Sequence, residues 1–390
     1  MEDYGKKIAG ICCFNVKNDP LLKGFAKLFG DSALESVEGY TEIVRALALE
    51  GQSLGDYLHD MLVFSDSPIL AECVKNLTEP RREAVEHDVA VAAEIAKTVS
   101  RELKTRLSAQ YSDFDFMSLP YFDSGDFGYT AEYFIHYVKV HGNGMFAKYK
   151  AFSFDSELRP IADTDKIRLT DLKNYEAQRQ QVIDNTICFL RGKPAQNVLL
   201  YGERGTGKSS TVKAILNEYE ELRMVEVSKN DVAMLPALFR KLRNIPLRFI
   251  VTIDDLAFAE NDDRFGILKA ALEGSLSAKP DNILIYATTN RRKIVRETAA
   301  DREISGADAI DESMSLADRF GLFITFMKPD KQVFLDIVQK LAADKGLVVS
   351  AERLETAAER FALRHGGRSP RTARQFVDWL DGRISLDLEY

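Results

Sequence analysis

The residues from Gly202 to Ser209 constrain this chain more than any other stretch. They read GERGTGKS and match the pattern G-x-x-x-x-G-K-[ST] in full, after the apolar run NVLLYG and before the helical pattern KSSTVKAILNEYE. The glycines would let backbone N–H groups curl around a phosphate, and a helix that begins near Lys208 would add partial positive charge. The sequence therefore predicts a phosphate loop at the end of a buried strand, made by Gly202, Glu203, Arg204, Gly205, Thr206, Gly207, Lys208, Ser209 and Ser210.

The last residues of this loop predict the ligands. The Lys208 ammonium would reach the β- and γ-phosphates of a nucleoside triphosphate, and the Ser209 hydroxyl would coordinate Mg²⁺. We therefore expect a nucleoside triphosphate and Mg²⁺ as cofactors, and the family resemblance described below implies that the nucleotide is ATP.

A second apolar run, FIVTIDD, ends on two adjacent carboxylates, Asp254 and Asp255. Burying two such charges is unfavourable unless cations or hydrogen-bond donors offset the lost hydration. A phosphate loop needs a carboxylate from a second strand to hold its metal, and Asp254 at the strand end suits that role. Asp255 is then the candidate that polarises the attacking water.

The chain from residue 166 onward alternates short apolar strands with amphipathic helices, which indicates an α/β fold with a parallel sheet. Residues 166–328 are expected to form a three-layer αβα nucleotide-binding domain, and the purely helical pattern of 329–390 a lid domain. The expected strands cover 197–202, 223–227, 247–255, 282–290 and 322–327, and the expected helices 175–192, 208–220, 232–243 and 264–276.

The first 160 residues differ from the rest of the chain in their pattern of apolar residues and predict a separate, mainly helical domain. Apolar residues at three-and-four spacing mark helices up to about residue 110. The runs 133–140 and 145–154 flank the sequence HGNG and predict a β-hairpin, and the polar stretch 155–165 predicts a linker. The aromatic residues of 111–154 could form a partner-binding face or the core of this domain, and core is the favoured interpretation.

Composition excludes some function classes. With 52 basic and 60 acidic residues, the formal net charge of −8 argues against a chain that mainly coats nucleic acid, so a DNA partner is not indicated by charge. No apolar run reaches the length of a membrane span, and the start of the chain does not read as a secretion signal. A cytoplasmic location without a membrane partner is expected.

The four cysteines, Cys12, Cys13, Cys73 and Cys188, lack C-x-x-C spacing and an accompanying histidine pattern. Spacing of this kind favours reduced structural thiols over a zinc site.

Several segments after residue 166 together resemble the AAA+ ATPases. RFIVTIDD resembles their Walker B strand, IYATTN the sensor 1 strand, SLADRFG the arginine-finger segment and GRSPRTARQF the sensor 2 segment. The last two segments are similar to those of the Holliday-junction branch-migration motor. The stretch from NYEAQRQQ to SLADRFG is more similar still to an uncharacterised group of bacterial AAA+ ATP-binding proteins of unknown function.

This resemblance implies catalytic roles for Asp255, Asn290, Arg319 and Arg371. Asn290, or Thr289 beside it, would lie between the γ-phosphate and the water. Arg319 would act as an arginine finger on the nucleotide of a neighbouring copy, which implies a ring-forming homo-oligomer such as a hexamer. Arg371 is favoured over Arg368 and Arg374 as sensor 2, because an N-cap at Ser369 and Pro370 at the first helical position would aim it at the nucleotide.

Two further residues before the phosphate loop, Leu172 and Tyr175, are candidates for adenine contacts, although apolar side chains there more commonly belong to the core. At the strand end the family usually carries Asp-Glu, whereas this chain has Asp-Asp. The shorter Asp255 carboxylate reaches less far toward a water, and general-base catalysis needs a separation of about 2.6–3.2 Å. The sequence thus predicts slow or partner-gated hydrolysis with ATP binding retained.

The sequence does not specify the client on which such an ATPase would act. The interval VSKNDVAMLP lacks the aromatic pore-loop residue of polypeptide-threading members, which argues against an unfoldase. Two function classes therefore stay open: an ATPase that remodels a protein or nucleic-acid client recruited by residues 1–160, and a nucleotide-dependent assembly switch or scaffold that hydrolyses little.

Overall fold

The chain forms two compact units in the computed structural model, which describes residues 4–257, 263–273, 280–290 and 319–386. One unit comprises residues 1–149 with 245–247, and the other comprises 150–244 with 248–390. The division falls before the predicted boundary at residue 160, because residues 151–161 belong to the sheet of the second unit.

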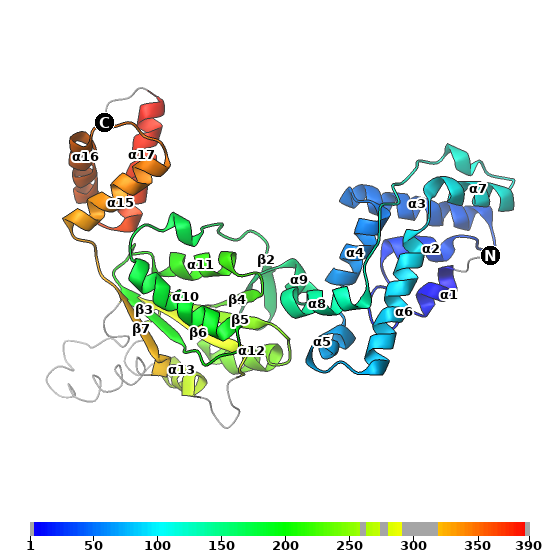
Figure 1. Ribbon diagram of the computed structural model, residues 1–390, viewed down its shortest axis with the longest axis horizontal. Helices are drawn as coiled ribbons and strands as arrows, with labels where there is room; N and C mark the ends of the chain where they lie inside the picture. Colours follow the sequence, from blue (N-terminus) through cyan, green and yellow to red (C-terminus); the bar gives the residue numbers. More distant parts are fainter. Residues whose placement is uncertain (1–3, 258–262, 274–279, 291–318, 387–390) are drawn as a thin grey trace. The chain divides into compact units, whose positions relative to one another are not determined.

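The first unit is helical over its described residues (Figure 1). Tyr40 and Phe25 are among its fully buried side chains, and the aromatic residues Phe116 and Phe134 join the same core. Most of the aromatic side chains between 111 and 149 thus pack inward or against this core, as favoured from the sequence. Its helices are α1 (Tyr4–Ala9), α2 (Pro20–Lys27), α3 (Ala33–Glu50), α4 (Leu54–Phe64), α5 (Pro68–Lys75), α6 (Glu79–Ala96), α7 (Ser100–Gln110), η1 (Phe116–Ser118), α8 (Ala131–His141) and α9 (Met145–Lys148).

The predicted hairpin around HGNG is wrong. Residues 131–141 form helix α8, whose N-cap Thr130 accepts a hydrogen bond from the Tyr133 N–H. Phe134 and Val138 lie four residues apart on its buried face, so helical spacing prevailed over the β propensity of the aromatic and β-branched residues.

A hairpin does occur a few residues later, at the sequence predicted to be a linker. Strand β1 (Ala151–Phe154) pairs antiparallel with β2 (Leu158–Ile161), with Pro160 opposite Phe152. β2 is an edge strand, where a proline is tolerated because the outer side of the strand has no neighbour to bond.

The second unit contains a seven-stranded sheet of order β2-β1-β4-β5-β6-β3-β7 (Figure 1). All pairs except β1–β2 are parallel. The remaining strands are β3 (Val198–Gly202), β4 (Leu222–Val227), β5 (Arg248–Ile253), β6 (Ile283–Thr289) and β7 (Leu322–Phe326), each within a range expected from the sequence or within one residue of it.

The helices of this unit also follow the predicted pattern, although the expected helix end beyond Glu273 lies outside the described residues. α10 and α11 pack on one face of the sheet through residues such as Val182, Phe189 and Ile215. The elements are η2 (Leu169–Asp171), α10 (Glu176–Leu190), α11 (Lys208–Glu218), η3 (Val232–Met234), α12 (Leu235–Leu242) and α13 (Asp263–Glu273).

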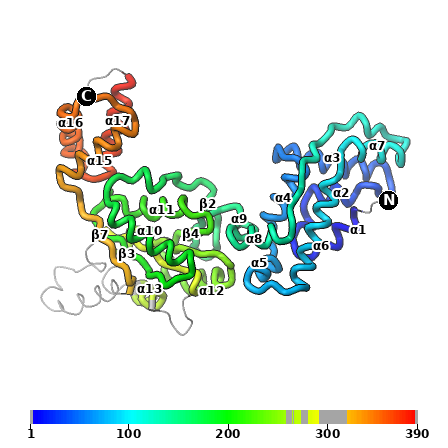
Figure 2. The backbone as a smooth tube through the Cα atoms, in the orientation of Figure 1, coloured from blue at the N-terminus to red at the C-terminus, as the bar shows by residue number. Residues whose placement is uncertain are grey.

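A small helical lid follows β7, and Figure 2 traces the chain from this strand into it. It consists of α15 (Lys331–Asp344), α16 (Ala351–Arg364) and α17 (Pro370–Ser385), which enclose their own core around Phe334 and Phe376. Ser369 caps α17 by accepting the Thr372 N–H at 3.1 Å, and Pro370 occupies the first turn, which confirms the predicted helix start.

Candidate functional site

The phosphate loop lies between β3 and α11, as the sequence predicts. Gly207 is the N-cap of α11 and has φ 98°, a left-handed conformation that suits glycine. Thr206 is buried, and its hydroxyl donates to the Glu203 carbonyl at 2.9 Å, which closes the loop on itself.

Lys208 is the buried cation of the site. Only 5% of the residue is exposed, and its ammonium donates at 2.8 Å to the carbonyls of Gly202 and Glu203 and to Oδ1 of Asn290. Burial lowers the pKa of Lys208 to about 8, although Asp254 and Asp255 act in the opposite direction. A cation held by uncharged oxygens in this way is suited to an incoming anion.

Asp254 follows β5 and is exposed. Its Oδ1 accepts the Ser209 hydroxyl at 2.7 Å and also the Thr288 hydroxyl. The residues predicted to hold a metal, Ser209 and Asp254, are therefore brought together.

Asp255 lies beside the sensor residue predicted from the sequence. Its Oδ1 accepts the Asn290 side-chain N–H at 2.7 Å, and Asn290 in turn accepts from Lys208. Asp255, Asn290 and Lys208 thus form one continuous hydrogen-bonded chain across the ends of β5, β6 and the phosphate loop.

The lid contacts the phosphate loop directly. The Arg371 backbone N–H donates to the Gly205 carbonyl at 3.2 Å, and a Cβ on Gly205 would come within 3.1 Å of the Arg371 Cβ. Arg374 also lines the cavity, with its guanidinium donating to the Asp171 carbonyl, whereas Arg368 forms an ion pair with Glu359 at 2.6 Å.

Arg319 lies apart from this group. It is exposed and precedes β7 by three residues, and the structure does not bring it among the residues that line the cavity.

A cavity of about 570 Å³ lies between the phosphate loop, the carboxylates and the start of α17. This volume is within the range of small-molecule sites. Leu172 and Tyr175 line it, but the Tyr175 hydroxyl donates to the Met327 carbonyl and its ring packs 5.3 Å from that of Phe326, so this tyrosine is also part of the core.

The residues present fit a nucleotide polyphosphate with Mg²⁺. The buried Lys208 ammonium donates to three neutral oxygens, those of Gly202, Glu203 and Asn290. The Ser209 hydroxyl and the Asp254 carboxylate lie 2.7 Å apart. Hard oxygen donors of this kind are the ligands that Mg²⁺ prefers.

Thr288 was missed by the sequence interpretation, which considered Thr289 and Asn290 at this strand end. Strand residues alternate between faces, so of two adjacent threonines only one can point toward the side of Asp254. That alternation was the available signal, and the structure shows that Thr288 is the one that reaches Asp254.

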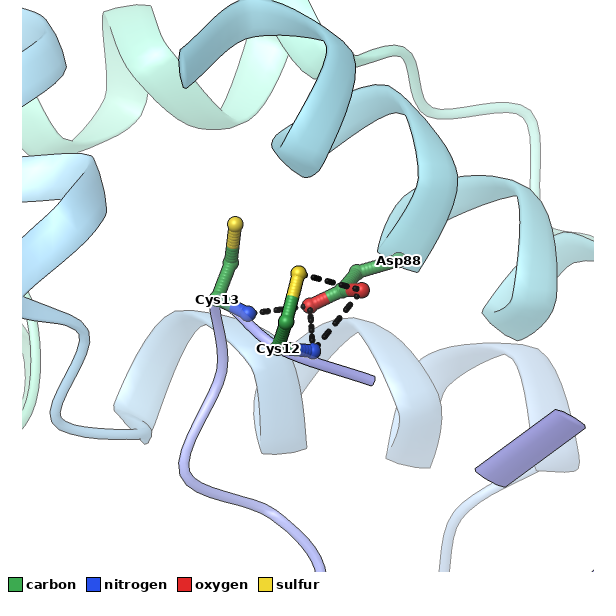
Figure 3. A group of neighbouring side chains, drawn as sticks. All are labelled: Cys12, Cys13 and Asp88. Carbon is green, nitrogen blue, oxygen red and sulfur yellow. Dashed lines mark hydrogen bonds between the residues drawn. The ribbon is translucent and has the colours of Figure 1, made fainter. Parts of the chain in front are cut away.

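The first unit holds another group of potential ligands, Cys12, Cys13 and Asp88, whose candidate ligand atoms lie within 4.8 Å of one another (Figure 3). The Asp88 carboxylate already accepts the backbone N–H groups of Cys12, Cys13 and Phe14, at 2.6–3.3 Å. Burial, reinforced by the Asp88 charge, raises the pKa of the Cys13 thiol, so that it stays protonated at neutral pH. All four cysteines are free thiols.

A family model described as a protein of unknown function (DUF815) matches residues 145–384. The chain belongs to the DUF815 family. Its motifs and its parallel strand order, with the phosphate-loop strand β3 between β6 and β7, are those of an AAA+ P-loop protein.

Among curated proteins, this DUF815 chain is similar to a probable spastin homologue of Brugia malayi, with 24% identity over 160 residues. That match covers 34% of this chain and 35% of the relative. It is also similar to the replication factor C large subunit of Staphylothermus marinus, with 38% identity over 65 residues, 16% of this chain and 15% of that one. The chain thus spans about a third or less of the curated relatives it matches.

Among solved structures, the chain is similar to RuvB, the Holliday junction branch migration motor of Thermotoga maritima. The identity is 16%, the TM-score is 0.41, and the match covers 57% of this chain and 66% of that one. Within the described residues, no helix of the DUF815 chain combines the length and apolar character that a membrane crossing requires.

Proposed function

We propose that this protein binds ATP with Mg²⁺, hydrolyses it, and uses the energy to remodel a protein or nucleic-acid client in the cytoplasm. The observation that carries the proposal is the hydrogen-bonded chain from Lys208 through Asn290 to Asp255, next to the Ser209–Asp254 pair. Together these groups offer a phosphate-binding cation, a metal-binding pair and a carboxylate within one cavity.

Each group has a distinct task in this proposal. Lys208 binds the β- and γ-phosphates through its ammonium, and Ser209 with Asp254 would hold Mg²⁺. When bound, Mg²⁺ neutralises charge that accumulates on the phosphates. Asp255 accepts a proton from the attacking water or orients it, while Asn290 holds the Asp255 carboxylate in place.

Arg371 supplies positive charge from the lid. Its backbone contact with Gly205 holds the first turn of α17 at the loop, so its guanidinium can approach a phosphate in the same cavity. A lid residue placed in this way would couple nucleotide binding to the position of α17.

Phosphate release by the purified protein, compared with Lys208→Ala and Asp255→Asn, tests the enzymatic part. We expect Lys208→Ala to abolish nucleotide binding and Asp255→Asn to retain binding while turnover falls by about 10²-fold or more. Turnover in Asp255→Asn equal to that of the parent protein would remove Asp255 from the reaction.

Arg319 is assigned to a neighbouring copy in a ring-forming homo-oligomer, such as a hexamer. Arginine fingers contribute about 10³–10⁵ in rate, so Arg319→Ala should keep ATP affinity and lose most hydrolysis. Turnover per chain should also rise with protein concentration. A monomer with full, concentration-independent turnover would rule out this assignment.

The second candidate is a nucleotide-dependent switch or scaffold, which the short Asp255 side chain favours because slow hydrolysis would prolong the ATP-bound state. Titrating ATP affinity and measuring turnover with and without DNA or RNA separates the two. Turnover stimulated by a client supports the remodelling enzyme, whereas tight binding with negligible turnover supports the switch. In either case the first unit is the proposed site of client recruitment.

A further inference from the structure

The backbone just after β5 has an unusual conformation. Asp255 has φ 52°, in the left-handed region that side chains rarely adopt. Aspartate and asparagine tolerate this region better than longer residues, because their short polar side chains can bond locally. The backbone conformation at position 255 therefore restricts which residues suit it, in addition to any requirement for a carboxylate.

Thr288, near the end of β6, holds this turn. Its hydroxyl accepts the Asp255 N–H at 3.1 Å, and its carbonyl accepts the Leu256 N–H at 2.7 Å. The same hydroxyl donates to Oδ1 of Asp254. One threonine thus contacts three consecutive residues, and it is itself only 5% exposed.

The position of Thr288 follows from the strand register. Ile253 pairs with Ala287 in the parallel ladder between β5 and β6, so Asp254 and Thr288 come next on adjacent strands. A hydroxyl can donate one hydrogen bond and accept others at the same time, which a valine of the same shape cannot do. Serine would retain this capacity without the methyl group.

The two carboxylates are fixed in different ways by this contact. Asp254 Oδ1 receives hydroxyl donors from both Thr288 and Ser209, which sets the orientation of the predicted metal ligand. Asp255 is turned by its backbone, and its carboxylate then meets Asn290 at 2.7 Å.

We propose that Thr288 is a positioning residue for ATP hydrolysis: it holds the left-handed turn that brings Asp255 against Asn290 while it orients Asp254 for the metal. This inference rests on the proposed function of the site. It also gives a reason for aspartate at position 255, because a left-handed backbone tolerates a short polar side chain better than a longer one. The shorter side chain is thus matched to the turn.

The test compares Thr288→Val with Thr288→Ser in the full chain. Thr252→Val serves as a matched control, because Thr252 lies on β5 two residues before Asp254, on the same face of the sheet, and outside this hydrogen-bonded group. ATP affinity is measured by calorimetry with Mg²⁺ and with EDTA, and turnover is measured by phosphate release. Thermal unfolding shows that each variant is folded.

We expect Thr288→Val to keep the ATP affinity in EDTA and to lose about tenfold to a hundredfold in the affinity gained from Mg²⁺, with a similar loss in turnover. Thr288→Ser should stay within about threefold of the parent protein, since its hydroxyl is retained. Thr252→Val should resemble the parent protein in all measurements.

Two results would overturn the proposal: parent-like values for Thr288→Val, or equal damage in Thr288→Ser, which would assign the effect to packing. If the proposed hydrolysis is wrong instead, the parent protein releases phosphate no faster than Lys208→Ala. The Mg²⁺-dependent affinities of the Thr288 variants then still test whether Thr288 orients Asp254. A parent protein that binds no ATP would overturn both.

Discussion

The two units each hold an aspartate that accepts several hydrogen bonds, and the two are held by different donors. Asp88 in the first unit is fully buried and accepts the backbone N–H groups of Cys12 and Cys13 (Figure 3). It also accepts that of Phe14. Asp254 in the second unit is exposed and accepts two side-chain hydroxyls.

This difference distinguishes a carboxylate whose partners are fixed backbone groups from one whose partners can rearrange to bind a cation. Backbone N–H groups cannot rotate away, so a carboxylate that satisfies them is fixed, and an unsatisfied buried N–H is unfavourable. Side-chain hydroxyls can rotate, and their oxygens can coordinate a cation together with the carboxylate. Partner type, more than residue type, thus distinguishes the two sites.

The largest expected effect comes from removing the structural carboxylate. Asp88→Ala leaves three backbone N–H groups of a buried segment unpaired, which should lower the free energy of unfolding of the first unit by about 3 kcal/mol or more. Hydrogen exchange of the Cys12–Phe14 amides and thermal unfolding of the full chain measure this. ATP binding should persist.

Asp254→Ala is the matched variant. It should lose Mg²⁺-dependent ATP affinity with little change in thermal unfolding, because Asp254 is exposed and water can replace its carboxylate as a hydrogen-bond acceptor. Similar destabilisation by the two substitutions would end the distinction between the sites.

Next in size is the pH dependence of the buried cation. Burial lowers the pKa of Lys208 in the folded protein from its ordinary value of 10.5 to about 8. Between these values the unfolded chain binds more protons than the folded one, so the stability of the ligand-free protein should rise with pH. From pH 8 to 9.5 the gain should be about 2 kcal/mol relative to Lys208→Met, measured by urea unfolding. Equal slopes in both proteins would show that Lys208 is not desolvated.

A smaller effect is expected in the lid. Arg371→Ala should weaken ATP binding about tenfold, since a charged hydrogen bond to a phosphate contributes roughly 1.5 kcal/mol. Arg368→Ala should change affinity little, because the Arg368 guanidinium is paired with Glu359 and is not among the described groups that line the cavity. Calorimetric titration of both variants measures the contrast, and the reverse order would move the sensor role to Arg368.

The smallest effect concerns the turn itself. Asp255→Gly should be more stable than Asp255→Ala by about 1 kcal/mol, because glycine adopts positive φ without a clash with its own Cβ. Unfolding of the two variants in urea gives the difference directly. Equal stability would show that the turn is not strained for alanine.

The sequence was sufficient for the nucleotide-binding unit because its signals are local. The phosphate loop, the strand ending at Asp254 and the helix start at Ser369 each lie within a few residues of the features that define them. Parallel strands then bring their ends to one edge, so Lys208, Asp254 and Asn290 meet without further information.

The errors and omissions have long-range or subtle causes. The residues from 133 to 140 fit both the helical and the strand periodicity of apolar residues. Packing of Phe134 and Val138 in the core favours the helix. Asp88 meets partners that are 74–76 residues away, and no pattern in the sequence links them. The left-handed backbone at Asp255 depends on Thr288 across the sheet, which the residue length alone could not indicate.

The edge strand β2 has a consequence for association between copies. A free sheet edge is a template onto which another chain can add a strand. Here that edge is four residues long and exposes the charged Arg159 and the ring of Pro160. Short length, charge and proline all disfavour such addition, so this margin of the sheet is protected against edge-to-edge aggregation, and copies of the protein would have to associate through other surfaces.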